Sequence, residues 1–305
     1  MNDLGASVIA RLKSKAQKDG LQLQLLLNLF CQEEFLRRIQ KSKYDQNLIL
    51  KGGFLLYTIS GFESRPTMDA DYMLKNHPNK NEDVVKMVQE IINCPSDNEF
   101  IRFEIRGTEP IAEHREYNGI RLNLIGYIKN TRTPFSVDFG VGDVVVPPPA
   151  KRILPVLLPG FESPQVLTYS LESTIAEKFD AMLSRMELTG RMKDFYDIYY
   201  LASTFDFEGR KLQEAISETL QNRGTPYERD SLQQIENLIV NKDILARWNS
   251  FCKKTLKFQL DFRDVMELMV KLIKPPYEAI INERECFENW KAESRVYFNS
   301  TNCSQ

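Results

Sequence analysis

Apolar residues recur at helical spacing in the first part of the chain. Ile9, Leu12 and Ala16 are three or four residues apart, and a denser apolar run extends from Leu21 to Ile39. Such spacing places apolar side chains on one face of a helix. Asp19-Gly20 interrupts the pattern, and glycine commonly follows the last turn of a helix. Residues 5 to 43 are therefore predicted to form two helices.

A shorter pattern occupies residues 48 to 92. The apolar run from Leu48 to Leu50 predicts a strand, and Phe54 to Ile59 predicts a helix that begins at two glycines and is ended by Gly61. Met68 to Leu74 predicts a second strand. Residues 83 to 92 carry valine and isoleucine at helical spacing, which predicts another helix.

Residues 99 to 146 alternate between apolar and polar positions, which is typical of strands. The alternation covers residues 100–106, 120–128 and 135–139, and Tyr117-Asn118-Gly119 is typical of a turn. This part of the chain predicts a mixed or antiparallel sheet.

Helical patterns dominate after residue 164, while the proline-rich segment from Pro147 to Pro164 is expected to be irregular. A helix is expected from Ser170 or Thr174, broken at Gly190, with a second over Met192–Leu201. Pro226 and Pro275-Pro276 are expected to break helices, and further helices are expected at Lys211–Arg223, Asp230–Val240, Asp243–Thr255, Phe262–Ile273 and Glu283–Ser294. The fold class is therefore α+β, with a mixed central sheet flanked by helices in residues 1–204 and a helical bundle domain in residues 205–305.

The composition excludes several classes of protein. The 305 residues are 42% apolar and 27% charged, with a formal net charge of -2, so the chain has no overall positive charge for nucleic acid. Five cysteines without a close pair and only two histidines argue against disulfides, zinc sites and histidine triads. The N-terminus has no signal-peptide pattern, and no apolar run is long enough for a membrane span, so we expect a cytoplasmic protein without membrane contact.

Asp69 and Asp71 are the candidate metal ligands. Alternate side chains of a strand point to the same face, so these two carboxylates would lie together, with Ala70 on the other face. Their mutual repulsion favours a cation between them, and oxygen ligands suit Mg²⁺, with Mn²⁺ as the alternative. A polar turn without a metal is the other interpretation.

Gly52 and Gly53 precede a predicted helix, where backbone N–H groups can meet the phosphates of a nucleotide. Lys51 either contacts phosphate or faces solvent. Arg65 either neutralises phosphate or pairs with an acidic residue, and Thr67 either contacts phosphate through its hydroxyl or is an ordinary β-branched strand residue.

Asp138 lies on a later predicted strand, opposite in direction to its apolar neighbours. It is a candidate third carboxylate that would accept the proton of an attacking hydroxyl. An exposed strand position without a catalytic role is the alternative.

Lys178 lies beside the apolar stripe of its predicted helix, so its ammonium group would point inward and need a partner. A triphosphate is one candidate, and a salt bridge with Asp194 or Asp197 is the other. Arg185 is seven residues further along on the same face and could contribute to nucleotide binding.

Four motifs in this order resemble those of the AbiEii/AbiGii abortive-infection toxin family, which has the polymerase-β-type nucleotidyltransferase fold. They are KGGFLL, RPTMDAD, AEKFDAMLSR and RMKDFYD. The resemblance covers about residues 9 to 203. It implies that Asp69, Asp71, Lys178 and Asp194 carry the chemistry, with Asp138 less firmly matched to the family pattern.

The resemblance also implies Mg²⁺-dependent transfer of a nucleotide from an NTP to an acceptor hydroxyl. In relatives the acceptor is often the end of a transfer RNA, the outcome is growth arrest, and a separate antitoxin accompanies the toxin. Two alternatives stay open: transfer to a small molecule or protein, and nucleotide binding without turnover.

Overall fold

The computed structural model describes residues 3–111 and 119–299. The chain divides into two compact units, which are described separately. The first comprises Met1–Gly142 and Pro149–Thr168, and the second comprises Asp143–Pro148 and Tyr169–Gln305. The expected boundary between residues 204 and 205 does not coincide with this division, because helices within residues 171–204 pack against helices that follow them.

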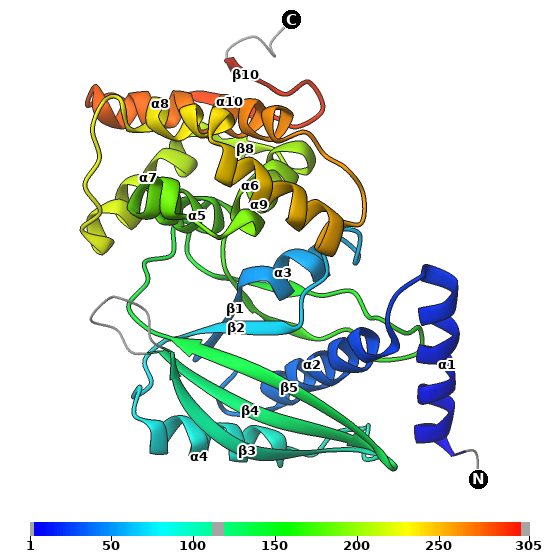
Figure 1. The fold of residues 1–305 in the computed structure, drawn as a ribbon. Helices are drawn as coiled ribbons and strands as arrows, with labels where there is room; N and C mark the ends of the chain where they lie inside the picture. The colour runs from blue at the N-terminus through cyan, green and yellow to red at the C-terminus, as the bar shows by residue number, and fades with distance from the viewer. Residues whose placement is uncertain (1–2, 112–118, 300–305) are drawn as a thin grey trace, which may run out of the picture. The chain divides into compact units, whose positions relative to one another are not determined.

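A seven-stranded sheet forms the centre of the first unit (Figure 1). Two neighbouring strand pairs, β2 with β5 and β1 with β7, are parallel and the other four pairs are antiparallel. The predicted mixed sheet is therefore confirmed. In sheet order the strands are β3 (Ile101–Ile111), β4 (Gly119–Ile128), β5 (Thr131–Gly140), β2 (Asp69–Leu74), β1 (Leu48–Lys51), β7 (Gln165–Thr168) and β6 (Ala150–Ile153).

The strand β6 corrects one expectation, since residues 150–153 pair with β7 instead of being irregular. Its neighbouring prolines lie outside residues 150–153, so they remove no hydrogen bond from the ladder. A turn was predicted at Tyr117-Asn118-Gly119. Tyr117 and Asn118 lie outside the described residues.

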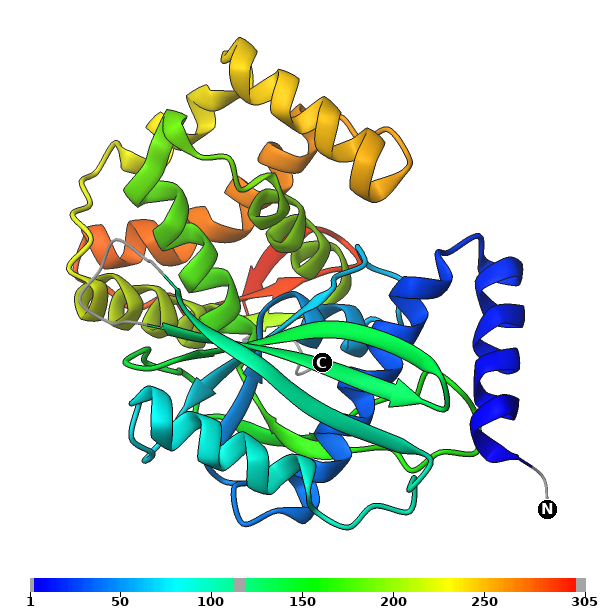
Figure 2. The same cartoon turned by 60° about the horizontal axis from the view of Figure 1, so that its bottom comes forward.

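Within the described residues, the helices of the first unit are α1 (Leu4–Asp19), α2 (Leu23–Lys41), α3 (Gly52–Ile59) and α4 (Asn81–Ile92). The break between α1 and α2 is confirmed, because Gly20 has φ 65° and donates its N–H to the carbonyl of Ala16. Figures 1 and 2 show α4 running beneath β3 and β4, and α2 packs against β5 and β7.

Alternation along β2 separates the core from the opposite face of the sheet. The ring of Tyr72 packs against Phe35 of α2 and Phe139 of β5, with centroid distances of 6.1 and 5.9 Å. Ala70 is buried on the same side. Asp69 and Asp71 therefore project from the other face, as the sequence pattern predicts.

Buried ionic groups on α2 fix two loops of the first unit. The Arg37 guanidinium donates to the carbonyl of Glu162 (2.7 Å), and that of Arg38 donates to the carbonyl of Ile101 (2.7 Å). Glu34 accepts a hydrogen bond from the side-chain amide of Asn98 (2.6 Å) and pairs with both arginines. These charges are satisfied inside the protein, so they serve the fold and do not form a ligand site.

The second unit is mainly helical. Helix α5 packs on α6 and α7, and α10 packs on α6, α7 and α8. Its elements are α5 (Leu171–Arg185), the 3₁₀ turn η1 (Met186–Leu188), α6 (Met192–Thr204), β8 (Phe207–Glu208), α7 (Gly209–Arg223), α8 (Ser231–Glu236), the 3₁₀ turn η2 (Asn237–Val240), α9 (Lys242–Phe251), the π-helical turn η3 (Cys252–Leu256), α10 (Phe262–Ile281), β9 (Glu288–Lys291) and β10 (Val296–Asn299).

Two expectations for the second unit were wrong. The helix expected at Glu283–Ser294 is replaced by β9, which lies between β8 and β10 in a three-stranded sheet; Trp290 is buried there and donates to the carbonyl of Ala202 (2.8 Å). Pro275 and Pro276 lie inside α10 and do not end it. The buried side chains of Ile273, Pro276 and Tyr277 hold this stretch against its neighbours and offset the lost backbone hydrogen bonds.

Within the described residues, no helix is both long enough and apolar enough to cross a membrane.

Candidate functional site

The N-terminus of α3 and the middle of β2 form the first cluster of candidate residues. Gly52 begins α3 with φ 69°, and a β-carbon added there would collide with the carboxylate of Asp71. A β-carbon on Gly53 would lie 3.1 Å from Oγ1 of Thr67 and 3.3 Å from Nη2 of Arg65. The structure thus brings together Gly52, Gly53, Arg65, Thr67 and Asp71. The two glycines leave space for an acidic, a hydroxyl and a basic group.

The register of the sheet places three carboxylates on one face. Asp71 pairs directly with Asp138 across the parallel strands β2 and β5, and Asp69 pairs with Ser136. Paired residues of neighbouring strands share a face, as do residues two apart on one strand. Asp69, Asp71 and Asp138 therefore project from the face of the sheet opposite to α2.

Arg121 is a member of this face that the sequence analysis missed. It pairs with Asp138 across β4 and β5, and its Nε and Nη2 each donate to one carboxylate oxygen of Asp138 at 2.7 Å. Those hydrogen bonds, and then the negative charges of Asp138 and Asp69, raise the pKa of Arg121. The alternation of residues 120–124 could have placed Arg121 on a polar face, but its partner depends on the strand register.

The residues of this face suit a divalent cation with two protein carboxylates. Groups of three His, Cys, Asp or Glu side chains arranged to hold a metal are absent from the described residues. Mg²⁺ is usually held by one or two carboxylates together with substrate phosphates, and Asp69 and Asp71 offer such a pair. Asp138 is engaged by Arg121, so the donor set fits a metal that arrives with a nucleotide.

The connection from α3 to β2 positions the remaining candidates of the first unit. Arg65 is buried and Thr67 is half-buried, and the Asp69 N–H lies 3.4 Å from the Thr67 hydroxyl. Gln32 of α2 donates to the carbonyl of Met68 at 2.6 Å, which fixes the start of β2. Lys51 is half-buried and precedes the first turn of α3. It lies opposite Asp71 in the register of the antiparallel strands β1 and β2.

Lys178 lies at the centre of the second cluster, in the second unit. Its ammonium contacts Asp194 at 2.9 Å and Asp197 at 2.6 Å, and the side chains of both aspartates are almost completely buried. Asp194 also accepts a hydrogen bond from Nε of Arg191 at 2.7 Å. In the structure Lys178 points inward and forms the salt bridges that were the alternative to a triphosphate partner. Arg191, a residue missed from the sequence, is a second cation on Asp194.

Charge balance in this cluster keeps Asp194 ionised. Burial alone raises the pKa of this carboxyl group, but the positive charges of Lys178 and Arg191 outweigh burial and bring the pKa below its usual range. Arg185, a predicted nucleotide-binding residue, is exposed at the last position of α5 and is not part of the contacts around Asp194.

A second ionic cluster of this unit surrounds Arg223. Its guanidinium pairs with Asp143 (2.7 Å), Asp180 (3.0 Å) and Glu177 (3.2 Å), and Glu177 also accepts a hydrogen bond from the Tyr169 hydroxyl (2.7 Å). These contacts tie α5 to the end of α7 and to the segment at residue 143. We regard the cluster as structural, since each carboxylate has a cationic partner.

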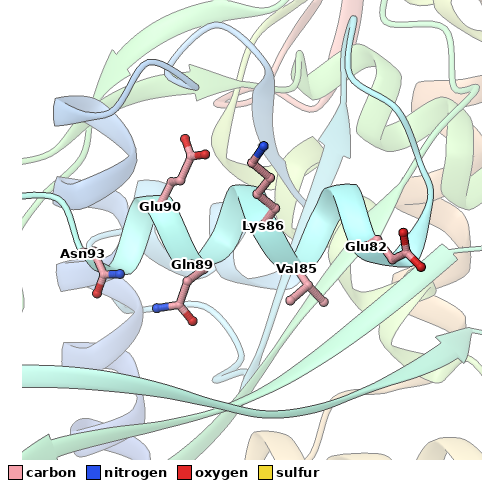
Figure 3. Close-up of a pocket in the computed structure, with 6 residues that line it drawn as sticks. All are labelled: Glu82, Val85, Lys86, Gln89, Glu90 and Asn93. Carbon is pink, nitrogen blue, oxygen red and sulfur yellow. The ribbon is translucent and has the colours of Figure 1, made fainter.

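A shallow hollow lies along α4, away from these residues. Figure 3 shows its lining side chains projecting from one helix: Glu82, Val85, Lys86, Gln89, Glu90 and Asn93. Glu90 is already bound by Lys43 (2.6 Å) and by the hydroxyl of Tyr44 (2.9 Å). The hollow contains none of the predicted site residues.

Comparison with known proteins gives the family of the chain. The family model "Nucleotidyl transferase AbiEii toxin, Type IV TA system" matches residues 34–271. Because this match covers most of the chain, the chain belongs to the AbiEii family of nucleotidyltransferase toxins, as the sequence motifs predicted.

Two solved structures resemble the chain over 83% of its length. A candidate nucleotidyltransferase from H. pylori has 13% identity, a TM-score of 0.45 and 96% of its own chain covered. JHP933 from Helicobacter pylori has 14% identity, a TM-score of 0.47 and 97% covered. No curated protein matches the chain.

Proposed function

We propose that this chain transfers a nucleotide from an NTP to the hydroxyl group of an RNA, such as a transfer RNA, and acts as the toxin of a toxin–antitoxin pair. Membership of the AbiEii family supports the nucleotidyltransferase class and the toxin role. The observation that carries the proposal is the position of Asp71, whose carboxylate lies against Gly52 at the start of α3.

The start of α3 suits the phosphates of an NTP. The first N–H groups of a helix have no partner inside the helix, and the helix dipole favours negative charge there. A phosphate would approach the backbone of Gly53, with Arg65 and Thr67 beside it, while the Asp71 carboxylate lies beside Gly52.

Asp69 and Asp71 would hold Mg²⁺, or Mn²⁺ in its place, together with the phosphates of the NTP. A bound divalent cation would supply neutralising charge for the triphosphate. These two aspartates lie on the same face as Asp138, which we propose as the carboxylate that accepts the proton of the attacking hydroxyl. Arg121 holds Asp138 in place through two hydrogen bonds.

Lys178 would supply positive charge to the triphosphate. Its ammonium has three donors, and Asp194 and Asp197 fix its position. Transfer would form a bond from the acceptor oxygen to the α-phosphorus and break the bond to the leaving pyrophosphate. Arg185, exposed at the end of α5, remains a proposed contact for the nucleotide.

Incubation with each labelled NTP, Mg²⁺ and total RNA tests the proposal directly. We expect label on RNA with at least one NTP, together with pyrophosphate release, and no label after Asp71→Ala. Label on a small molecule or protein would show that the acceptor is different. Nucleotide binding without pyrophosphate release would show a binding module and contradict the proposed activity.

A toxin also requires a partner that neutralises it. We propose a separate antitoxin protein and a cytoplasmic site of action. Expression of the wild-type chain alone is expected to stop growth, whereas the Asp71→Ala variant is expected to be tolerated at the same protein level. Growth arrest by both variants would contradict toxicity through nucleotide transfer.

A further inference from the structure

The segment that joins α9 to α10 carries three lysines and an exposed aromatic ring. Residues 252–260 read CKKTLKFQL and contain no acidic residue. Lys253, Lys254 and Lys257 are exposed, and the ring of Phe258 is 53% exposed. We call these four side chains the basic–aromatic tip.

The lysines of the tip differ from three other exposed lysines of the second unit. Lys211 pairs with Glu208 (2.6 Å), Lys274 with Glu278 (3.9 Å) and Lys291 with Asp206 (2.5 Å). In the described residues, none of the three tip lysines forms an ion pair. Their charge is therefore available to an external anion.

The backbone of the tip is held in a defined shape. The carbonyl of Leu260 accepts hydrogen bonds from Nε1 of Trp248 (2.7 Å) and Sγ of Cys252 (3.8 Å). Lys257 has φ 63° and donates its N–H to the carbonyl of Cys252 (2.7 Å), which closes the π-helical turn η3.

Phe258 is exposed although buried aromatic rings lie close to it in the chain. Trp248 packs on Phe251 and Phe262 with ring centroids 5.4 and 5.2 Å apart. These rings fill the space between α9 and α10, and Trp248 and Phe262 are buried. Phe258 belongs to the same segment but keeps its ring in solvent, where an apolar surface gains from a stacking partner.

We propose that the basic–aromatic tip binds single-stranded RNA, with the lysines on phosphates and Phe258 stacked on a base. Unpaired cations next to an exposed aromatic ring match the two parts of a single-stranded nucleic acid, its charged backbone and its unpaired bases. The choice of RNA as the ligand rests on the proposed function, in which the acceptor is an RNA. It is tested by binding alone, so its outcome is independent of nucleotide transfer.

The experiment measures binding of the full chain to a labelled 20-nucleotide single-stranded RNA by fluorescence anisotropy, without NTP or metal. The test variant replaces Lys253, Lys254 and Lys257 by Gln. The control replaces Lys211, Lys274 and Lys291 by Gln, which changes the net charge by the same amount in the same unit. We expect the tip variant to bind at least about tenfold more weakly than the control at low salt.

Salt dependence gives a second measure of the same contacts. Each phosphate contact with a single strand contributes roughly -0.7 to the slope of log K against log salt concentration. The slope of the tip variant should therefore be smaller in magnitude by about 2, while the control keeps the wild-type slope. Equal affinity and equal slope for the two triple variants would overturn the proposal.

Phe258→Ala separates stacking from general attraction to polyanions. We expect at least about fivefold weaker binding of single-stranded RNA, whereas Phe287→Ala, at a ring that is 67% exposed, should have no effect. Wild-type affinity in Phe258→Ala would contradict stacking. Displacement of the RNA by polyglutamate of equal charge, at equal concentration, would show a site for acidic protein and would also overturn the proposal.

Discussion

The carboxylate of Asp71 occupies the space that a side chain on Gly52 would need. The glycine and the aspartate are on α3 and β2, and β1 pairs with β2 so that Lys51 lies opposite Asp71. The start of the helix and the acidic position on the strand are therefore fixed together.

Gly52→Ala should remove activity through this contact. A non-glycine residue with positive φ costs roughly 1–2 kcal/mol, and the added methyl group must also displace the Asp71 carboxylate. Because a displacement of about 1 Å at a reacting group can cost around 100-fold in rate, we expect a loss of at least that size. Initial rates of pyrophosphate release and thermal melting measure the two effects.

Gly53→Ala is the matched control, since its β-carbon would meet Thr67 and Arg65 at 3.1 and 3.3 Å and the residue has no positive φ. We expect a smaller loss of activity and of melting temperature than for Gly52→Ala. Equal losses in the two variants would show that the contact with Asp71 has no special role.

Asp71→Asn should strongly reduce transfer and leave the fold intact. The change keeps the shape of the side chain but removes one of the two carboxylates proposed to hold Mg²⁺. We expect a loss of about 10²–10³-fold in kcat, the size found when one donor of an oxyanion hole is removed in acyl transfer. Activity is measured across a Mg²⁺ titration, and folding by thermal melting; a large drop in melting temperature would mean that Asp71 is structural.

Much of this face was predictable from local sequence. Alternation over residues 68–74 places Asp69 and Asp71 together, and the paired glycines mark the start of α3. The pairing of Asp138 with Arg121 was not, since it depends on the register of β4 and β5 and no local pattern fixes that register.

Local sequence patterns gave wrong predictions for two segments near the end of the chain. Residues 283–294 resemble a helix by composition, but Trp290 becomes buried in a small sheet through its partners on β8 and β10. Pro275 and Pro276 are helix breakers by local rule, and α10 continues through them because its buried face is held by its neighbours. Tertiary packing decided both cases, and a local sequence pattern does not show which elements pack together.

Stability at low pH should report the charge of Asp194. Its pKa in the folded protein is below the value near 4 of an unfolded chain, because Lys178 and Arg191 outweigh the effect of burial. Ionised Asp194 therefore stabilises the fold above that value, and the contribution disappears as pH falls through the folded pKa. Urea unfolding at pH 7 and pH 3 should show a smaller loss on acidification in Asp194→Asn than in the wild type. Asp264→Asn, at an exposed position, should behave as wild type.

Removal of Arg121 should impair the reaction without unfolding the sheet. Arg121 is partly exposed, and its Nε and Nη2 both donate to Asp138. Without the guanidinium, Asp138 loses the donors that orient it, so we expect Arg121→Gln to reduce kcat about 10- to 100-fold, as for residues that orient a functional carboxylate. Arg121→Lys should recover part of the loss, because one charged donor remains. Wild-type kcat in Arg121→Gln would remove Asp138 and Arg121 from the proposed mechanism.

Arg191 is expected to act on the nucleotide through Asp194. One oxygen of Asp194 accepts from Lys178 at 2.9 Å and the other accepts from Arg191 at 2.7 Å, so the aspartate is shared between two cations. Without Arg191, Lys178 is the cation that neutralises Asp194, so less positive charge is left for a triphosphate. Arg191→Gln should therefore raise KM for the NTP by about tenfold, which corresponds to about 1.4 kcal/mol, and Arg191→Lys should restore most of the affinity. The control is Arg210→Gln, since Arg210 is exposed and pairs with Glu285. Loss of melting temperature in Arg191→Gln with KM unchanged would show that the arginine only stabilises α6.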